Sequence, residues 1–270
     1  MTCTLVFIGG GNMASAILGG LLKSGWTPAQ VCVVEPFEAQ RTALMQQFGV
    51  RALAAADASL AGAQTVVWAV KPQSFAEAAA PCRPFVPQAL HLSVMAGIRS
   101  EALARATGSE RIVRAMPNTP ALIGQGISGL FARAAVTPPE REQVQALLAP
   151  TGATLWVDQE ADLDAVTALS GSGPAYVFFF LEALVDAAQR MGLSAEQGTR
   201  LALATFGGAT EMAQRSTEPL ARLRERVTSK GGTTQAALQR MAAGEVQEHL
   251  VAAIIAARDR ARELGAEFGS

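Results

Sequence analysis

A glycine turn near the start of the chain has the spacing that binds a dinucleotide. Gly9, Gly11 and Ala14 fill the three positions of a G-x-G-x-x-G/A motif. The first permits a tight turn, the second lets the backbone approach a pyrophosphate, and the third lets helix and strand pack closely. A strand predicted over residues 4–8 precedes the motif, and a helix predicted over residues 13–23 offers free N–H groups to phosphates. The cofactor site is therefore expected to include Ile8, Gly9, Gly10, Gly11, Asn12 and Met13.

An acidic residue ends the second predicted strand, residues 31–35. Glu35 lies 24 residues after Gly11 (35 − 11), where a carboxylate can accept hydrogen bonds from the adenosine ribose and repel a 2′-phosphate. That arrangement favours NADH. Arg41 follows closely and could instead turn toward a phosphate, and Glu35 could also be a plain surface carboxylate. The sequence thus predicts NADP or NAD as the cofactor and leaves the choice open.

Two further segments follow predicted strands and are assigned to the same site. The first is Ala69-Val70-Lys71-Pro72, after the strand predicted over residues 65–70. Ligands of doubly wound sheets bind at the carboxyl ends of the strands, so the backbone of this loop is expected at the cofactor. The Lys71 side chain could approach it or lie in solvent, and Pro72 would start the next helix. The second segment follows the strand predicted over residues 90–94 and contributes Met95, Ala96 and Gly97.

Histidine chemistry is scarce. His91 and His249 are the only two histidines, and neither has a nucleophile or metal partner near it in sequence. A Ser-His-Asp hydrolase, an HExxH protease or a histidine-based hydroxy-acid dehydrogenase needs more than this. A reduction would therefore work with little acid–base help from histidine. A protonated imine suits that condition because it already carries its proton and needs only hydride.

These residues are positioned by an α/β fold followed by helices. Short β-rich runs alternate with helical stretches up to about residue 157, which predicts βαβ units and a mainly parallel, doubly wound Rossmann-type sheet. From residue 162 onward no strand-like alternation occurs, and helices are predicted over residues 162–191, 194–215, 233–243 and 246–265. The predicted domains are therefore a dinucleotide-binding Rossmann domain over residues 1–160 and an all-helical domain over residues 161–270.

Composition limits the classes of partner. The 22 basic and 23 acidic residues nearly cancel, which leaves no electrostatic footprint for nucleic acid or an acidic membrane. Half of the residues are hydrophobic, so some apolar surface is expected in a subunit interface. The apolar stretch over residues 176–188 contains Glu182 and Asp186 and is interpreted as a buried helix rather than a membrane span. The absence of an N-terminal signal pattern and three cysteines without CxxC spacing favour a cytoplasmic protein with reduced thiols, and no metal site is expected.

Three motifs beyond the glycine turn carry a resemblance to a known family. They are Met116-Pro117-Asn118-Thr119-Pro120, Leu169-Ser170-Gly171-Ser172-Gly173-Pro174-Ala175-Tyr176 and Arg226-Val227-Thr228-Ser229-Lys230-Gly231-Gly232-Thr233-Thr234. Together with the glycine turn and Ala69-Val70-Lys71-Pro72, and in the same order, they resemble pyrroline-5-carboxylate reductase over nearly the whole chain. The resemblance implies an oxidoreductase acting on a CH–NH bond, with NAD(P)H reducing 1-pyrroline-5-carboxylate to L-proline in proline biosynthesis. It also implies that residues 161–270 form a helical dimerisation and substrate domain, which interlocks two subunits into a homodimer, and often a decamer built from such dimers.

The resemblance assigns the substrate to the segment that opens a predicted helix. Gly231 and Gly232 allow close approach there, and the helix start presents bare N–H groups to a carboxylate. Ser229 and Thr233 can add hydroxyl donors. Thr234 matches the family position whose hydroxyl faces the ring nitrogen, so it is the predicted catalytic residue. Asn118 is assigned to the cofactor, although it could instead contact substrate or stabilise its own turn.

The chain departs from the family pattern at several positions, and two rival functions fit the same motifs. Lys230 stands where many members have proline, Ala56 and Asp57 where many place an asparagine near the ribose, and Glu35 where neutral or basic residues are frequent. The rivals are a reductase of a related cyclic imine and a catalytically silent cofactor-binding regulator. A β-hydroxyacid dehydrogenase is disfavoured because residues 162–189 contain no lysine.

Overall fold

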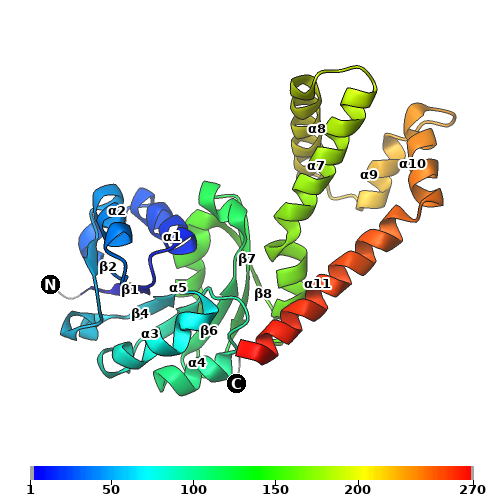
Figure 1. Cartoon of the computed structure of the whole chain (residues 1–270). Helices are drawn as coiled ribbons and strands as arrows, with labels where there is room; N and C mark the ends of the chain where they lie inside the picture. The colour runs from blue at the N-terminus through cyan, green and yellow to red at the C-terminus, as the bar shows by residue number, and fades with distance from the viewer. Residues whose placement is uncertain (1–2, 269–270) are drawn as a thin grey trace. The chain divides into compact units, whose positions relative to one another are not determined.

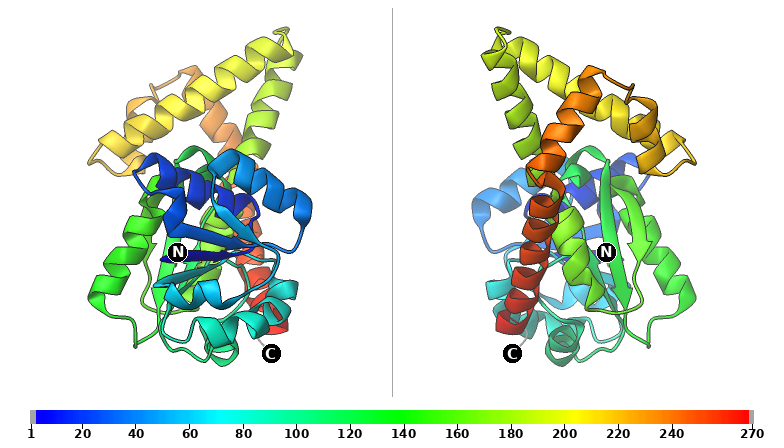
Figure 2. Two further views of the ribbon diagram at one scale, coloured as in Figure 1. Left: turned by 90° about the vertical axis from the view of Figure 1, so that its left-hand side faces the viewer. Right: turned by 90° about the vertical axis from the view of Figure 1, so that its right-hand side faces the viewer.

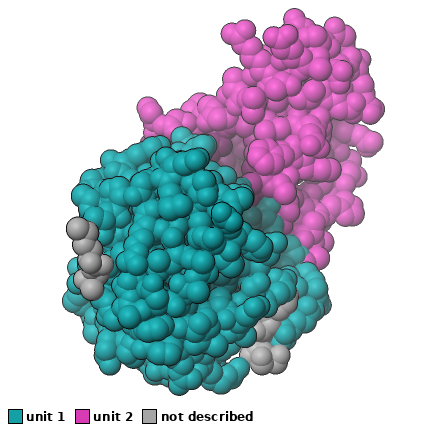
Figure 3. Space-filling view, turned by 60° about the vertical axis from the view of Figure 1, so that its left-hand side comes forward, with its two compact units in different colours: residues 1–172, 257–270 teal, residues 173–256 magenta. Residues whose placement is uncertain are grey.

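The computed structural model describes residues 3–268, and the chain divides into two compact units. Unit 1 comprises Met1–Ser172 with Ala257–Ser270, and unit 2 comprises Gly173–Ala256 (Figure 3). The sequence places the domain boundary after residue 160. In the structure, the segment from residue 161 to Ser172 groups with the sheet, and so does the end of the last helix.

Unit 1 is built on one eight-stranded sheet (Figure 1). The strand order is β3-β2-β1-β4-β5-β6-β7-β8, and all neighbours are parallel except β6 and β7. The order reverses between β1 and β4, which makes the carboxyl ends of these two strands the switch point of the sheet. The strands are β1 (Leu5–Ile8), β2 (Val31–Val34), β3 (Arg51–Leu53), β4 (Thr65–Trp68), β5 (Leu90–Ser93), β6 (Ile112–Met116), β7 (Gly126–Ala132) and β8 (Gly152–Trp156).

Helices cover both faces of the sheet, and two apolar clusters fill the layers between them. One cluster packs α1, α2 and α5 on one face, and the other packs α3 and α4 on the opposite face. The central strands β1, β2 and β4 are buried at every residue, as their unbroken apolar sequences require. The helices of this unit are α1 (Asn12–Lys23), α2 (Glu38–Phe48), α3 (Phe75–Cys82), α4 (Ser100–Thr107), α5 (Pro138–Leu148) and α6 (Asp162–Val166), followed by a π-helical turn (Thr167–Gly171).

A partly buried ion network fixes the segment that leads into the second unit. The Arg114 Nη1 atom on β6 donates to Glu160 Oε1 at 2.7 Å, and both Ser100 N and Ser100 Oγ donate to the same carboxylate at 2.6 Å. Arg99 Nη2 donates to Asp164 Oδ2 of α6 at 2.8 Å. The network thereby ties α4, β6 and α6 together.

Unit 2 is helical (Figure 2). Ser194 caps one of its helices, since its Oγ accepts from Gln197 N at 3.1 Å. Gly232 is the N-cap of another. The helices are α7 (Gly173–Arg190), α8 (Ala195–Arg215), α9 (Leu220–Arg226), α10 (Thr233–Ala243) and α11 (Val246–Phe268), the last of which runs on into unit 1.

The predicted architecture is confirmed, with local differences. The sequence missed β3 and α9, because a three-residue strand and a two-turn helix are too short to show a periodic pattern. The helix predicted over residues 162–191 is interrupted at the π-helical turn and at Ser172.

The interpretation of residues 176–188 as a buried helix is wrong for the single chain. Ala188 is the only buried residue of α7, whereas Val177, Phe178, Phe179 and Leu184 are exposed. Apolar composition shows that a surface avoids water but does not show what covers it. By length and composition Asp162–Arg190 could also cross a membrane, and a helix covered by another subunit has the same composition.

Candidate functional site

The glycine turn connects β1 to α1 at the switch point of the sheet. Gly9 has φ +94°, a conformation that L side chains rarely adopt. A Cβ at Gly9 would also stand 2.7 Å from the Ala69 carbonyl oxygen, so this position tolerates only glycine. The close approach brings the ends of β1 and β4 together, and Ala69 N donates to Ile8 O at 2.8 Å.

The start of α1 is open to a ligand. Its N-cap is Gly11, which has no side chain to satisfy the first N–H groups. Among the described residues, no hydrogen bond is recorded for the backbone N–H groups of Asn12, Met13 and Ala14. A Cβ built on Gly11 would meet nothing within 4 Å. This end of the helix therefore offers both the space and the donors that a pyrophosphate needs.

Glu35 connects the glycine turn to the end of β2. Its exposed fraction is 6%, its Oε2 accepts from Gly10 N at 2.9 Å, and its Oε1 accepts from Phe37 N at 3.0 Å. Both carboxylate oxygens thus hold backbone N–H groups while the residue lines the cavity described below. The sequence predicted a carboxylate beside the ribose; the structure adds that this carboxylate also fixes the turn.

Two side chains of α2, Gln40 and Arg41, bind backbone in the same region, and together with Glu35 they form a clamp at the glycine turn. Gln40 Nε2 donates to Gly10 O at 2.5 Å, so side chains hold the Gly10 residue at both its N–H and its carbonyl. Arg41 Nη1 donates to the carbonyl oxygens of Glu35 at 2.9 Å and Pro36 at 2.7 Å. Arg41, which the sequence suggested as a possible partner of a phosphate, is therefore hydrogen-bonded to backbone carbonyls.

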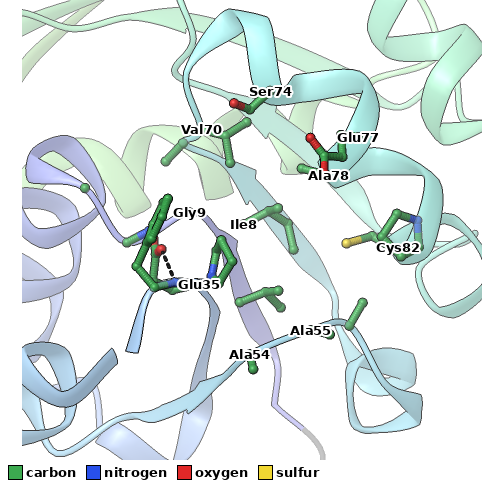
Figure 4. A pocket seen from close by; sticks show the side chains of 18 of the residues that line it. Ile8, Gly9, Glu35, Ala54, Ala55, Val70, Ser74, Glu77, Ala78 and Cys82 are labelled. Carbon is green, nitrogen blue, oxygen red and sulfur yellow. Dashed lines mark hydrogen bonds between the residues drawn. The ribbon is translucent and has the colours of Figure 1, made fainter. Parts of the chain in front are cut away.

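A cavity of about 690 Å³ lies against this clamp (Figure 4). Glu35 lies beside Gly9, with Ala54 and Ala55 next to it, while Ser74 and Glu77 come from the β4–α3 segment. Eight predicted cofactor residues line it, and Lys71 is the cationic one among them: Ile8, Gly9, Gly10, Gly11, Glu35, Ala69, Val70 and Lys71. The sequence missed Val34, Pro36, Phe37, Ala54, Ala55, Ala56, Ser74, Glu77, Ala78, Pro81 and Cys82.

Seven other predicted cofactor residues do not line this cavity. Met95 is 3% exposed and packs in the apolar cluster beneath α3 and α4, so its side chain belongs to the core. Gly97 has φ +76° and shapes the loop after β5. The remaining five are Asn12, Met13, Pro72, Ala96 and Asn118.

The Asn118 amide is used within unit 1. Its Oδ1 accepts from Ile127 N at 3.0 Å, and its Nδ2 donates to Ser170 Oγ at 3.1 Å. Ser170 lies in the π-helical turn, where Ser172 N donates to Thr167 O at 2.8 Å. π-Helical turns are frequent at functional sites. Asn118 therefore joins the Met116-Pro117-Asn118 segment to the start of the Ser170-Gly171 motif.

The predicted substrate segment lies in unit 2 and opens α10. Gly231 has φ +75°, which favours glycine, and a Cβ at Gly232 would lie 2.5 Å from Ser229 Oγ, so a larger residue there would displace the Ser229 hydroxyl. Thr233 and Thr234 are the first two residues of the helix. Among the described residues, no hydrogen bond is recorded for their backbone N–H groups, which suits an anionic group.

Of the histidines and cysteines, Cys82 alone lines the cavity, and the others lie outside the segments described above. His91 is buried on β5, where Trp68 Nε1 donates to its Nδ1 at 3.1 Å; burial, followed by the charge of Arg111, lowers its pKa to about 4. His249 is exposed on α11. All three cysteines are free and buried, and burial raises the pKa of Cys82, the thiol at the cavity, to about 11. Within the described residues, no group of three or more His, Cys, Asp or Glu side chains could hold a metal ion.

Comparisons with known proteins agree with both units. The family model for pyrroline-5-carboxylate reductase dimerisation matches residues 160–264, and a model described as NADP oxidoreductase coenzyme F420-dependent matches residues 4–97. The pyrroline-5-carboxylate reductase of Pseudomonas aeruginosa is 42% identical over 270 residues, covering 99% of both chains. The Pisum sativum enzyme of the same name is 36% identical, covering 97% of this chain and 96% of its own.

Solved structures give the same result. A pyrroline-5-carboxylate reductase from Coxiella burnetii superposes with a TM-score of 0.90 at 34% identity, covering 98% of this chain and 99% of that one. The Plasmodium falciparum pyrroline carboxylate reductase with NADP bound has a TM-score of 0.85 at 28% identity, covering 97% and 98%. The sequence motifs, the fold and these relatives together show that the chain belongs to the pyrroline-5-carboxylate reductase family.

Proposed function

We propose that this chain reduces the C=N bond of 1-pyrroline-5-carboxylate to give L-proline, the last step of proline biosynthesis. The observation that carries the proposal is its 42% identity, over 99% of its length, to a pyrroline-5-carboxylate reductase. Two structural features support it: an open, uncapped helix start at the glycine turn and a second one at Gly231–Thr234. One suits a dinucleotide pyrophosphate and the other a small carboxylate.

The residues of the cavity fit a reduced nicotinamide dinucleotide. Gly9, Gly10 and Gly11 would hold the pyrophosphate, Glu35 the adenosine ribose, and the backbone of Ala69 and Val70 the part that reaches toward the nicotinamide. When bound, the cofactor supplies hydride to the imine carbon. The contribution of the protein is position, since holding donor and acceptor together can supply about 7–11 kcal/mol of a barrier.

NADH is the cofactor that this cavity favours. A 2′-phosphate would stand against the Glu35 carboxylate, and the guanidinium of Arg41 is bound to the carbonyls of Glu35 and Pro36. Lys71, the cationic lining residue, follows β4 rather than β2. The electrostatics at the ribose therefore oppose the NADP phosphate.

The substrate segment would hold both the carboxylate and the ring nitrogen of the imine. The N–H groups at the start of α10 would bind the carboxylate, with the hydroxyls of Ser229 and Thr233 as further donors. Thr234 would orient the ring nitrogen and assist its protonation. Neither histidine is placed in this role, because His91 is buried in the sheet and His249 is exposed on α11.

We further propose that the functional unit is a cytoplasmic homodimer formed through unit 2, with a decamer built from five such dimers as its larger assembly. The dimerisation model covers α7–α11 up to residue 264. The exposed apolar residues Val177, Phe178, Phe179 and Leu184 on α7 supply a surface that a second copy would cover.

Substrate kinetics on Thr234→Ala test this function. The variant should lower kcat while leaving the Kd for NADH unchanged, and Thr217→Ala, which removes an exposed hydroxyl of the same unit, should change neither. Equal loss of turnover and cofactor binding in Thr234→Ala would assign that residue a folding role instead. Higher kcat/KM for the six-membered ring homologue would make the chain a different imine reductase, and cofactor binding without turnover would make it a silent regulator.

A further inference from the structure

Phe37 is an aromatic side chain exposed at the rim of the cofactor cavity. It is 73% exposed and is the only exposed aromatic residue among the described side chains of unit 1. Phe37 lines the same cavity as Glu35 and the glycine turn. One exposed apolar side chain on a surface needs no explanation. An exposed ring in the wall of a ligand cavity is different, because a bound ligand can cover it.

The backbone holds Phe37 in place before any ligand binds. Phe37 N donates to Glu35 Oε1 at 3.0 Å, and Phe37 O accepts from Arg41 N at 3.0 Å in the first turn of α2. Phe37 is the N-cap residue of that helix, with extended φ −85° and ψ 120°. The direction of its Cα–Cβ bond is therefore set by the β2–α2 turn, which lowers the cost of placing the ring against a ligand.

Small apolar side chains line the cavity next to this turn. Glu35 N donates to Leu53 O at 2.8 Å, which places the end of β3 directly beside the end of β2. The next three residues, Ala54, Ala55 and Ala56, all line the cavity, and their side chains are single methyl groups. Glu35 is the one charged lining residue on these two strand ends, since the other two, Lys71 and Glu77, come from the β4–α3 segment. This part of the cavity therefore suits a flat, uncharged ring.

We propose that Phe37 packs against the adenine ring of the cofactor, with the methyl groups of Ala54, Ala55 and Ala56 lining the same subsite. In the cofactor, adenine is bonded to the ribose that Glu35 would hold. Phe37 lies two residues after Glu35, so it is placed next to the group that adjoins this ribose. The inference rests on the proposed function only in taking this cavity as the dinucleotide site. It makes Phe37 a determinant of cofactor affinity that acts apart from hydride transfer.

Binding of cofactor fragments to Phe37→Ala tests the inference. Calorimetry would give the Kd of ADP, of NADH and of reduced nicotinamide mononucleotide, which lacks adenine. The Kd of ADP and of NADH should rise about tenfold, within the range that base–aromatic stacking provides. The Kd of the mononucleotide and kcat at saturating NADH should not change. Phe37→Tyr, which keeps the ring, should bind as the wild type does, and so should Met45→Ala, which removes an exposed side chain of the same helix outside the cavity.

Two results would overturn the inference. One is a Kd of ADP in Phe37→Ala within about twofold of the wild-type value, which is a difference below about 0.5 kcal/mol. The other is an equal rise for ADP and for the mononucleotide, which would show a general change in the site rather than a lost contact with adenine. Wild-type protein that binds ADP and NADH but does not reduce pyrroline-5-carboxylate would contradict the proposed function and leave this inference supported by its own data.

Discussion

Replacing Glu35 with glutamine should weaken the fold and change the cofactor preference together. The carboxylate accepts from Gly10 N at 2.9 Å and from Phe37 N at 3.0 Å. Glutamine has a similar shape but only one acceptor oxygen, so its NH₂ group would face one of these two N–H groups. Losing a hydrogen bond to a charged acceptor costs about 2 kcal/mol. At about 2–4 °C per kcal/mol for a chain of this size, Glu35→Gln should lower the Tm by about 4–8 °C.

The same substitution removes a charge from the ribose subsite. Two like unit charges about 5 Å apart repel by about 3 kcal/mol at an effective dielectric constant of 20. The carboxylate can therefore disfavour a 2′-phosphate by up to about 100-fold. We expect the ratio of kcat/KM for NADH to that for NADPH to fall at least about tenfold in Glu35→Gln, because solvent and counterions screen part of the repulsion. The ratio also cancels any damage to the turn that affects both cofactors equally.

Steady-state kinetics with both cofactors and thermal unfolding of the same preparations provide the assay. Glu38→Gln is the matched control, since Glu38 is an exposed carboxylate on α2 outside the cavity, and it should change neither the Tm nor the ratio. An unchanged cofactor ratio in Glu35→Gln would refute the electrostatic reasoning. An unchanged Tm would show that the two backbone hydrogen bonds contribute little to stability.

Three further predictions concern stability and assembly. The pKa of His91 is lowered from 6.5 to about 4, first by burial and then by the charge of Arg111, so the fold favours the neutral form. The free energy of unfolding should therefore have its full value above pH 6.5 and should decline by about 3 kcal/mol as the pH falls toward 4. Urea unfolding of His91→Asn should show a flatter dependence on pH. Glu160→Gln should cost about 3 kcal/mol in urea unfolding, because it leaves Arg114 (side chain 6% exposed) without its carboxylate, and a cost below about 1 kcal/mol would show that solvent replaces the pair. If the chain forms the proposed dimer, Phe178→Asp on α7 should convert it to monomer in light scattering, and a persistent dimer would place the interface elsewhere.

The sequence predicted the parts of the site that depend on local backbone chemistry. Gly9 and Gly11 were identifiable because strand, turn and helix follow one another directly between Leu5 and Lys23, and each position needs a small residue for its own reason. Gly231 and Gly232 were identifiable in the same way, before the start of α10. Motifs of this kind can be recognised without knowledge of the tertiary fold.

Tertiary contacts explain what the sequence did not predict. Gln40 holds the Gly10 carbonyl from 30 residues away, and Phe37 lines the cavity only because α2 begins beside the glycine turn. Met95 follows a strand end, as a cofactor residue should, yet its side chain points into the core. Position along a strand predicts which edge of the sheet a residue reaches, and the packing of helices decides which side chains enter the cavity.

The apolar helix α7 shows a second limit. Its composition predicted burial, and the chain by itself leaves Phe178 60% and Phe179 66% exposed. Hydrophobicity measures the free energy of leaving water, which is the same whether the cover is the chain's own core or another subunit. The dimerisation family match supplies the distinction that composition could not.

The most direct measurement is the steady-state reduction of pyrroline-5-carboxylate by the wild-type protein, with NADH and NADPH compared and proline quantified as the product. We expect one proline formed for each nucleotide oxidised and a higher kcat/KM with NADH than with NADPH. A higher kcat/KM with NADPH would contradict the role assigned to Glu35. No proline with either nucleotide would contradict the proposed function itself.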